Sequence, residues 1–444
     1  MSSLLIQNAT VITEGRREEA DVYIVGDRIF SVGKGFSPVA DRKIDARGLW
    51  LLPGVIDDQV HFREPGLTHK GDLTTESLAA VAGGVTSYME MPNTSPAAIT
   101  HELLEQKYSR AAEVSLANYS FFIGASNDNL EQLKSTDGKK VCGIKIFMGS
   151  STGDLLVDDP QALESIFREC NLLIATHCEY EPLIRSNTQW YKDKYGEDMD
   201  PALHADLRNH EACYLSSSFA VQLAQKHNTR LHILHISTAR ELELFRNDIP
   251  LEQKRITAEV CVHHLTFSRA DYATLGNRIK WNPAVKDASD REALWQALLD
   301  NRLDIIATDH APHTREEKAQ PYFKAPSGGP LIQHTLQLML EHAREGRITV
   351  ERVVEKMCHA PAQMFQIDRR GFIREGYYAD LVLVDPNATH VVTPESLYYK
   401  CGWSPLEGRT FHHRIVHTIV SGHWAWNNGQ FDLSQTGQRL AFNR

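Results

Sequence analysis

Eight short apolar segments recur through the middle of the chain, and most are followed by a stretch with helical spacing. Strands that alternate with helices are typical of βα units, which build parallel sheets. Eight such units in about 260 residues match the size of a (β/α)8 barrel. An open, doubly wound sheet is the alternative, but no Gly-x-Gly-x-x-Gly follows the early strands. The expected strands are 55–62, 84–91, 118–126, 143–149, 172–179, 231–237, 257–264 and 303–310.

Both ends of the chain have a different pattern, in which apolar and polar residues alternate between Gly, Asn and Asp turns. This alternation predicts short strands rather than βα units. Asn427-Asn428-Gly429 is a candidate hairpin turn. We therefore expect an α/β protein with two domains: a small β-sandwich assembled from 1–52 and 376–444, and a barrel formed by 53–375.

Charge and cysteine content exclude several classes of protein. The chain has 57 acidic and 47 basic residues, a net charge of -10, and no basic cluster that would bind nucleic acid. No apolar run approaches the roughly 18 residues of a membrane helix, and the first residues lack a signal-peptide pattern. The seven cysteines are scattered and form no Cys-x-x-Cys pair, which predicts reduced thiols and a cytoplasmic protein.

Five of the expected strands carry or end in a side chain that can bind a metal: His61, Lys145, His177, His235 and Asp309. A single histidine at the end of an apolar strand is more often a packing or surface residue than a ligand. Three histidines and an aspartate at equivalent places in one barrel are different, because imidazole and carboxylate together suit Zn²⁺. The active sites of such barrels lie at the carboxyl ends of the strands. The pattern predicts a zinc site there.

The first barrel strand also offers groups for a substrate. Gln59, His61 and Arg63 share the same parity, so their side chains point the same way. Arg63 either pairs with Glu64 at the surface or, standing before a Pro-Gly turn at the barrel mouth, holds a substrate carboxylate. We favour the second role.

Lys145 lies in a strand too apolar to leave its ammonium group in water. Three roles fit: an ion pair with a carboxylate, a Schiff-base lysine, or a lysine carbamylated by CO₂ that bridges metals. Desolvation favours the neutral amine that the last two roles need. The surrounding histidines favour the carbamate, because a Schiff-base enzyme has no need of them.

The segment DHAPH at the end of the eighth strand completes the candidate site. Asp309 can bind metal and exchange a proton with water, and His313 can contact a substrate. His310 is expected to be a structural neighbour. The adjacent His263 and His264 should face opposite sides of their strand and serve packing. The polar stretch 193–212 fits either a loop over the barrel mouth or a solvated helix connection.

At these residues the chain resembles the amidohydrolase superfamily and, within it, the dihydroorotases. The resemblance covers nearly the whole length of the chain. The segments HFREPG, MPNT and DHAPHT, taken together, are specific to this family. The matching segments are PGVIDDQVHFREPG (53–66), MEMPNTSP (89–96), GIKIFMG (143–149), THCE (176–179), HILHIS (232–237), WNPAVK (281–286), TDHAPHT (308–314), EGYYADLVLVD (375–385) and SPLEGRT (404–410).

The resemblance implies reversible, metal-dependent hydrolysis of L-dihydroorotate to N-carbamoyl-L-aspartate, in pyrimidine synthesis. It implies one or two Zn²⁺ ions, a carbamate on Lys145 that bridges them, and a homodimer. By this resemblance His61 holds the first metal, His177 and His235 hold the second, and Asp309 binds the first and acts as general base and acid. The substrate-binding residues that it implies are Arg63, Asn93, Asn282 and His313.

One position departs from the family pattern. The first strand of the family ends in His-x-His, and here Gln59 replaces the first histidine. An amide oxygen is a poorer zinc ligand, so the first metal should bind weakly or be absent. This departure raises a second hypothesis, a catalytically silent partner of aspartate transcarbamoylase. The enzymatic alternatives are allantoinase and dihydropyrimidinase, and a binding protein for free ureides is a weaker one. Arg63 favours dihydroorotate, whose carboxylate the other substrates lack.

Overall fold

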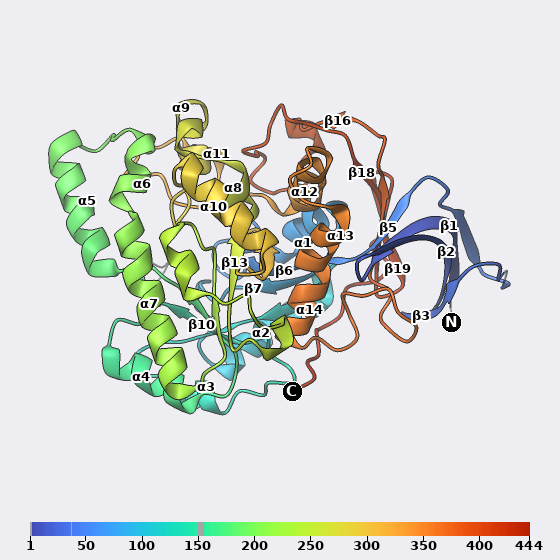
Figure 1. The fold of residues 1–444 in the computed structure, drawn as a ribbon, viewed down its shortest axis with the longest axis horizontal. Helices are drawn as coiled ribbons and strands as arrows, with labels where there is room; N and C mark the ends of the chain where they lie inside the picture. Colours follow the sequence, from blue (N-terminus) through green and yellow to red (C-terminus); the bar gives the residue numbers. More distant parts are fainter. Residues whose placement is uncertain (1, 37, 150–154) are drawn as a thin grey trace.

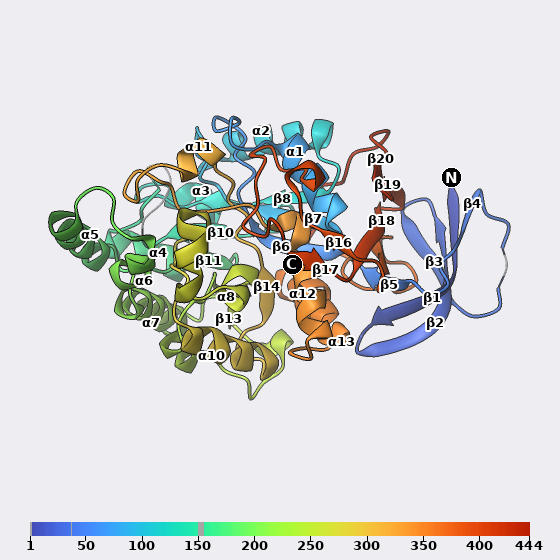
Figure 2. The same ribbon diagram turned by 90° about the horizontal axis from the view of Figure 1, so that it is seen from above.

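The computed structural model describes residues 2–36, 38–149 and 155–444. A mixed sheet lies at one end of the molecule and a barrel with its helices forms the rest (Figure 1, Figure 2). This agrees with the predicted fold class, a barrel with a small β domain built from both chain ends. The sheet contains β1 (Ser3–Thr13), β2 (Arg16–Val25), β3 (Arg28–Gly33), β4 (Arg42–Asp45), β5 (Trp50–Pro53), β15 (Leu381–Asp385), β18 (Arg414–Val420), β19 (His423–Asn427) and β20 (Gln430–Phe431).

The two chain ends meet at β5, which runs parallel to β1 and antiparallel to β15. Leu51 pairs with Val11 on one side and with Leu383 on the other. Leu51, Leu381 and Leu383 are buried in the apolar layer of this sheet. Its strands come from 3–53 and 381–431, and the domain boundaries after residues 52 and 375 stay predictions.

The barrel strands run parallel and follow one another in chain order. The third predicted strand splits at Phe122, so that its first part pairs with the second barrel strand and its last part with the fourth. A bridge between Val60 and His310 closes the barrel. The strands are β6 (Val55–Val60), β7 (Val85–Glu90), β8 (Asn118–Phe121), β9 (Ile123–Gly124), β10 (Ile144–Phe147), β11 (Ile174–His177), β12 (Leu231–Ile233), β13 (Ile256–Cys261) and β14 (Ile305–Ala307).

Helices cover the barrel, and their first residues explain where they begin. Asp72, Asp159 and Asn209 each accept a hydrogen bond from the backbone of the first helical turn that follows. The helices are α1 (Leu73–Ala82), α2 (His101–Val114), α3 (Leu130–Lys134), α4 (Pro160–Glu169), α5 (Glu181–Tyr195), α6 (His204–Leu207), α7 (His210–His227), α8 (Val262–Thr266), α9 (Tyr272–Leu275), α10 (Ala288–Leu299), α11 (Arg315–Lys318), α12 (Thr335–Arg344), α13 (Val350–Val354) and α14 (Ala360–Phe365).

The structure decides between two expectations for the stretch 193–212 and corrects the end of the seventh barrel strand. The polar stretch 193–212 contains the end of α5, α6 and the start of α7, which is the helical alternative. The seventh strand ends earlier than predicted, at Cys261, so His263 and His264 lie in the first turn of α8 with ring centroids 4.1 Å apart and do not face opposite ways. No helix in the described ranges is long and apolar enough to cross a membrane.

Candidate active site

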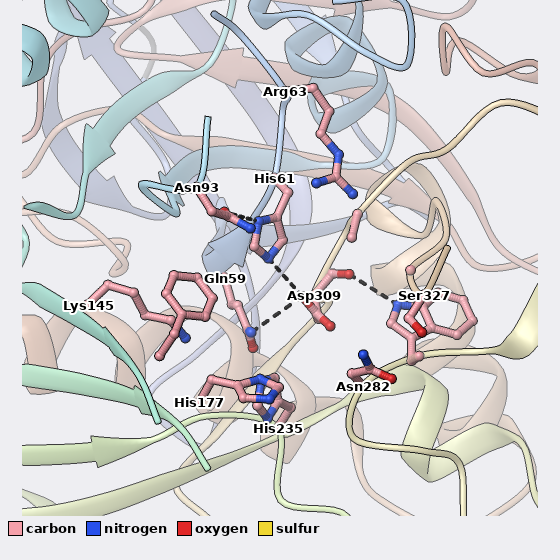
Figure 3. A pocket seen from close by; sticks show the side chains of 14 residues that line it. Gln59, His61, Arg63, Asn93, Lys145, His177, His235, Asn282, Asp309 and Ser327 are labelled. Atoms are coloured by element: carbon pink, nitrogen blue, oxygen red, sulfur yellow. Dashed lines mark hydrogen bonds and ion pairs between the residues drawn. The ribbon is translucent and has the colours of Figure 1, made fainter. Parts of the chain in front are cut away.

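A small pocket lies at the carboxyl ends of the barrel strands and brings together nine of the ten predicted site residues (Figure 3). His61 directly follows β6, His177 ends β11, and Asp309 lies two residues beyond β14. The tenth residue, His313, lies beside the pocket and contacts Arg63. The lining consists of Gln59, His61, Arg63, Asn93, Lys145, Phe147, His177, His235, Trp281, Asn282, Asp309, Ala311, Ser327 and Gly328.

His177 and His235 face each other from neighbouring strands. His177 Nδ1 lies 3.0 Å from His235 Nε2, and His177 Nε2 lies 3.0 Å from Oε2 of Glu179. The carboxylate accepts the Nε2 proton, so Nδ1 keeps its lone pair. Burial lowers the pKa of both imidazoles, which are therefore neutral at pH 7. A tetrahedral zinc with bonds of about 2.0–2.1 Å places two ligand nitrogens ~3.3 Å apart, so this pair fits a shared divalent ion.

Glu179 and Arg208 support this histidine pair, and neither was predicted. The Arg208 guanidinium donates to Glu179 Oε2 over 2.8 Å. Burial alone would raise the pKa of Glu179, but the charge of Arg208 and the hydrogen bond from His177 lower it to about 2. A carboxylate on the outer nitrogen fixes the tautomer of a ligating histidine and increases its basicity. The sequence contained one signal, because Glu179 has the same parity as His177 and follows it by two residues.

Lys145 is buried in β10, with 1% of its surface exposed. Its ammonium lies over the Phe147 ring, 4.6 Å from the centroid, and within the described part of the chain it has no carboxylate partner at ion-pair distance. Burial lowers its pKa to about 7. In a large fraction of the molecules the Lys145 amine is therefore neutral at physiological pH, as carbamylation or Schiff-base chemistry requires. The ion-pair role for Lys145 finds no support among the described residues.

The opposite wall contains His61 and Asp309. His61 Nδ1 lies 2.8 Å from Asn93 Oδ1, and its Nε2 lies 3.1 Å from Asp309 Oδ1. Because the Asn93 oxygen accepts the Nδ1 proton, the neutral ring turns a lone pair toward a carboxylate oxygen. Burial lowers the pKa of His61, which keeps the ring neutral. Two acceptors that face each other at this distance fit a cation bound between them.

Gln59 lies next to this pair but presents its amide nitrogen. Gln59 Nε2 donates to Asp309 Oδ1 over 3.4 Å, and its Oε1 accepts from the Cys261 thiol over 3.6 Å. In this orientation the carboxamide offers no lone pair to an ion bound at Asp309. The donor set here is thus one imidazole and one carboxylate, which is poorer than the set around His177.

The other end of the pocket is positively charged. Arg63 is 2% exposed, and its Nε donates to the Pro312 carbonyl over 3.1 Å. Burial lowers its pKa to about 10, so it stays charged at pH 7. No carboxylate of the described residues forms an ion pair with it. Glu64, the partner in the alternative that we did not favour, pairs with Arg110. The guanidinium is therefore available to an anionic ligand.

Asn282 and the backbone complete the pocket. Asn282 Oδ1 is buried and has no hydrogen-bond partner among the described residues. Trp281 Nε1 donates to the Asp309 carbonyl over 3.3 Å and so fixes that strand end. Arg63, His235 and Asp309 all have positive φ, at 73°, 40° and 47°. Such backbone strain in non-glycine residues concentrates at functional sites.

Comparison with known proteins shows the family of the chain. The amidohydrolase family matches residues 50–425. A dihydroorotase of Halobacterium salinarum is 32% identical over 419 residues, covering 94% of this chain and 95% of the relative. An allantoinase of Solibacter usitatus is also 32% identical, over 457 aligned residues that cover 99% and 97%.

Among solved structures, an L-hydantoinase (dihydropyrimidinase) from Arthrobacter aurescens has a TM-score of 0.93 and 26% identity, and the match covers 99% of this chain and 100% of that one. These relatives are named for different cyclic substrates, and each match covers nearly the whole chain. The chain therefore belongs to the amidohydrolase family, as a hydrolase of cyclic amides.

Proposed function

We propose that this protein is a dihydroorotase, which interconverts L-dihydroorotate and N-carbamoyl-L-aspartate. The observation that supports this choice is the buried guanidinium of Arg63, which lines the pocket without a carboxylate partner among the described residues. A buried charge without a counterion is costly, and an anionic ligand offsets that cost. Dihydroorotate carries a carboxylate on its ring, whereas allantoin, hydantoin and dihydrouracil do not.

The pocket residues support a division of roles. His177, His235 and a carbamylated Lys145 hold one divalent ion, proposed to be zinc, and His61 and Asp309 hold a second, more weakly bound one. When bound, such an ion polarises the scissile carbonyl and lowers the pKa of water. The carbamate forms when the neutral Lys145 amine adds to the carbon of CO₂ and releases one proton.

The remaining residues act on the substrate and on protons. Asp309, which accepts a hydrogen bond from Gln59, takes a proton from the attacking water and returns it to the ring nitrogen that leaves. Arg63 binds the carboxylate, with His313 beside it, and Asn93 and Asn282 bind ring groups from the pocket wall. Holding both ends of the ring fixes the amide bond near the water.

The decisive experiment is turnover by the purified protein, supplied with zinc and bicarbonate, of L-dihydroorotate, allantoin, hydantoin and dihydrouracil. We expect L-dihydroorotate to have the highest kcat/KM. Preference for a neutral ring would assign the protein to that substrate instead. No turnover of any ring by a folded, zinc-loaded protein would favour the silent partner, and co-purification with an aspartate transcarbamoylase would then test that role. Homodimer formation stays a prediction.

A further inference from the structure

Two buried lysines lie behind the pocket wall that Ser327 and Gly328 form. Lys280 is 7% exposed and Lys318 is 5% exposed. Lys280 follows the seventh barrel unit, and Lys318 ends α11, the short helix that begins after the DHAPH segment. Neither residue lines the pocket. They touch the protein backbone of the wall from its outer side.

Both ammonium groups bind carbonyl oxygens of one loop. Lys280 Nζ donates to Tyr322 O over 2.7 Å and to Ala325 O over 2.6 Å. Lys318 Nζ donates to Pro326 O over 2.9 Å and to Gly328 O over 2.7 Å. Four carbonyls of residues 322–328 are thus turned toward the two lysines.

These two side chains are unusual because no carboxylate of the described residues forms an ion pair with either. Burial lowers the pKa of Lys280 to about 7 and lowers that of Lys318 well below its usual value, and each is also close to other positive groups. Burying an amine without a counterion costs stability, whether the group keeps its charge or gives up a proton. The carbonyls that the two lysines bind belong to the segment that contributes Ser327 and Gly328 to the pocket lining, so the arrangement points to a role in the site.

The loop links the lysines to the cationic end of the pocket. His313 Nδ1 accepts from Lys70 Nζ over 3.1 Å, so its Nε2 carries the proton and donates to Ser327 O over 3.0 Å. The same Nε2 lies 3.1 Å from Arg63 Nη2. The loop position therefore fixes where His313 lies against Arg63.

The wall has little freedom to adapt. Gly328 has φ +124°, and a Cβ there would lie 2.6 Å from the Ala311 carbonyl. A Cβ on Gly329 would lie 2.7 Å from the Trp281 ring. The loop therefore packs tightly against backbone and an aromatic ring, and the two lysines add hydrogen bonds to four of its carbonyls.

We propose that Lys318, supported by Lys280, is a positioning residue that holds the 322–328 wall and thereby sets the affinity for the carboxylate end of the substrate. This inference rests on the proposed function for the identity of the substrate. It assigns to Lys318 no contact with substrate or with the reacting atoms. Its effect passes through Ser327 and His313 to Arg63.

The test compares K318M and K280M with K324M, whose lysine lies in the same loop but is exposed. We expect K318M to raise KM for L-dihydroorotate by about tenfold or more, equivalent to ~1.4 kcal/mol, while kcat and zinc content change little. K280M should act in the same direction, and K324M should match the wild type. Hydrogen–deuterium exchange of the 321–329 peptide should rise in K318M and not in K324M.

Each other outcome overturns the inference. Unchanged exchange in K318M would show that Lys318 does not hold the loop. Faster exchange with an unchanged KM would show that the loop does not set substrate affinity. K280M decides both points if K318M does not fold. If the wild type does not bind L-dihydroorotate, the proposed function fails. The role of Lys318 is then decided by peptide exchange and by the KM for the ring that the protein does hydrolyse.

Discussion

The two halves of the pocket that we propose to bind metal differ in how their side chains are held. The histidine half consists of Lys145, His177 and His235, and the outer nitrogen of His177 is held by the buried Glu179. The carboxylate half consists of His61 and Asp309, and Gln59 next to them offers only an amide N–H. Outer hydrogen bonds tune metal affinity. The carboxylate half thus has fewer candidate ligands than the histidine half because Gln59 supplies an N–H where a ligand lone pair would be needed.

Asp309→Asn should have the largest effect. Asn keeps the shape of the side chain but cannot take a proton from water, and general acid–base catalysis contributes about 10²–10⁴-fold. We expect kcat to fall by that factor while KM changes little, measured by steady-state hydrolysis of L-dihydroorotate. A variant with wild-type kcat would remove Asp309 from the role of base and leave the carboxylate half without a catalytic function.

Arg63→Met tests whether substrate affinity can be lost without a change of metal binding in either half of the pocket. Loss of a buried, charge-assisted contact costs about 3 kcal/mol, so KM should rise about 100-fold. Zinc content, measured by elemental analysis, should equal that of the wild type. Normal KM in this variant would contradict the assignment of a carboxylate-bearing substrate.

Glu179→Gln should weaken the histidine half alone. The amide cannot supply the negative charge that holds the His177 tautomer, and loss of such outer partners costs about 10–100-fold in metal affinity. Competition with a chelator measures this loss. Glu181→Gln, at a half-buried position on α5, is the matched control and should behave as the wild type. Equal affinity in both variants would show that Glu179 does not tune the metal.

The pH dependence of metal loading tests Lys145. Because its pKa is lowered to about 7 by burial, the neutral amine decreases about tenfold per pH unit below that value. With dissolved CO₂ held constant, recovery of activity by the metal-free protein should rise with pH up to about 7 and then level off. A rise that continues toward the ordinary lysine pKa would exclude a depressed pKa in the folded protein.

Gln59→His should have the smallest effect on rate. An imidazole at this position adds a ligand to the carboxylate half, so zinc should bind there about tenfold or more tightly, equivalent to ~1.4 kcal/mol. Zinc stoichiometry should increase, while kcat should change by less than about tenfold. An unchanged stoichiometry would show that Gln59 does not limit metal binding. Cys261→Ser, which keeps a donor to the Gln59 oxygen, should leave the stoichiometry unaltered.

Much of the architecture was readable in the sequence. The strand–helix alternation predicted the barrel, because strands buried on both faces are largely apolar, and the active sites of such barrels lie at the carboxyl ends of the strands. That same rule identified His61, His177 and Asp309, which the structure brings into one pocket. Their roles as ligands or base stay predictions until they are measured.

Other residues were not predictable, because their meaning depends on distant neighbours. Arg208 directly follows α6 and reaches Glu179 only in the folded chain. Lys280 and Lys318 read as ordinary polar residues of loops and a short helix, and nothing local indicates that both are buried.

By itself, the sequence determined the barrel, the chain ends that combine into one sheet, and the polar residues that stand at strand ends, because periodicity is a local property. The tertiary structure was needed to see which nitrogen of His177 faces His235 and which way the Gln59 amide turns. It was also needed to see that Arg63 is buried and has no carboxylate partner among the described residues. These facts depend on hydrogen bonds and burial between residues far apart in the chain, which no local pattern records.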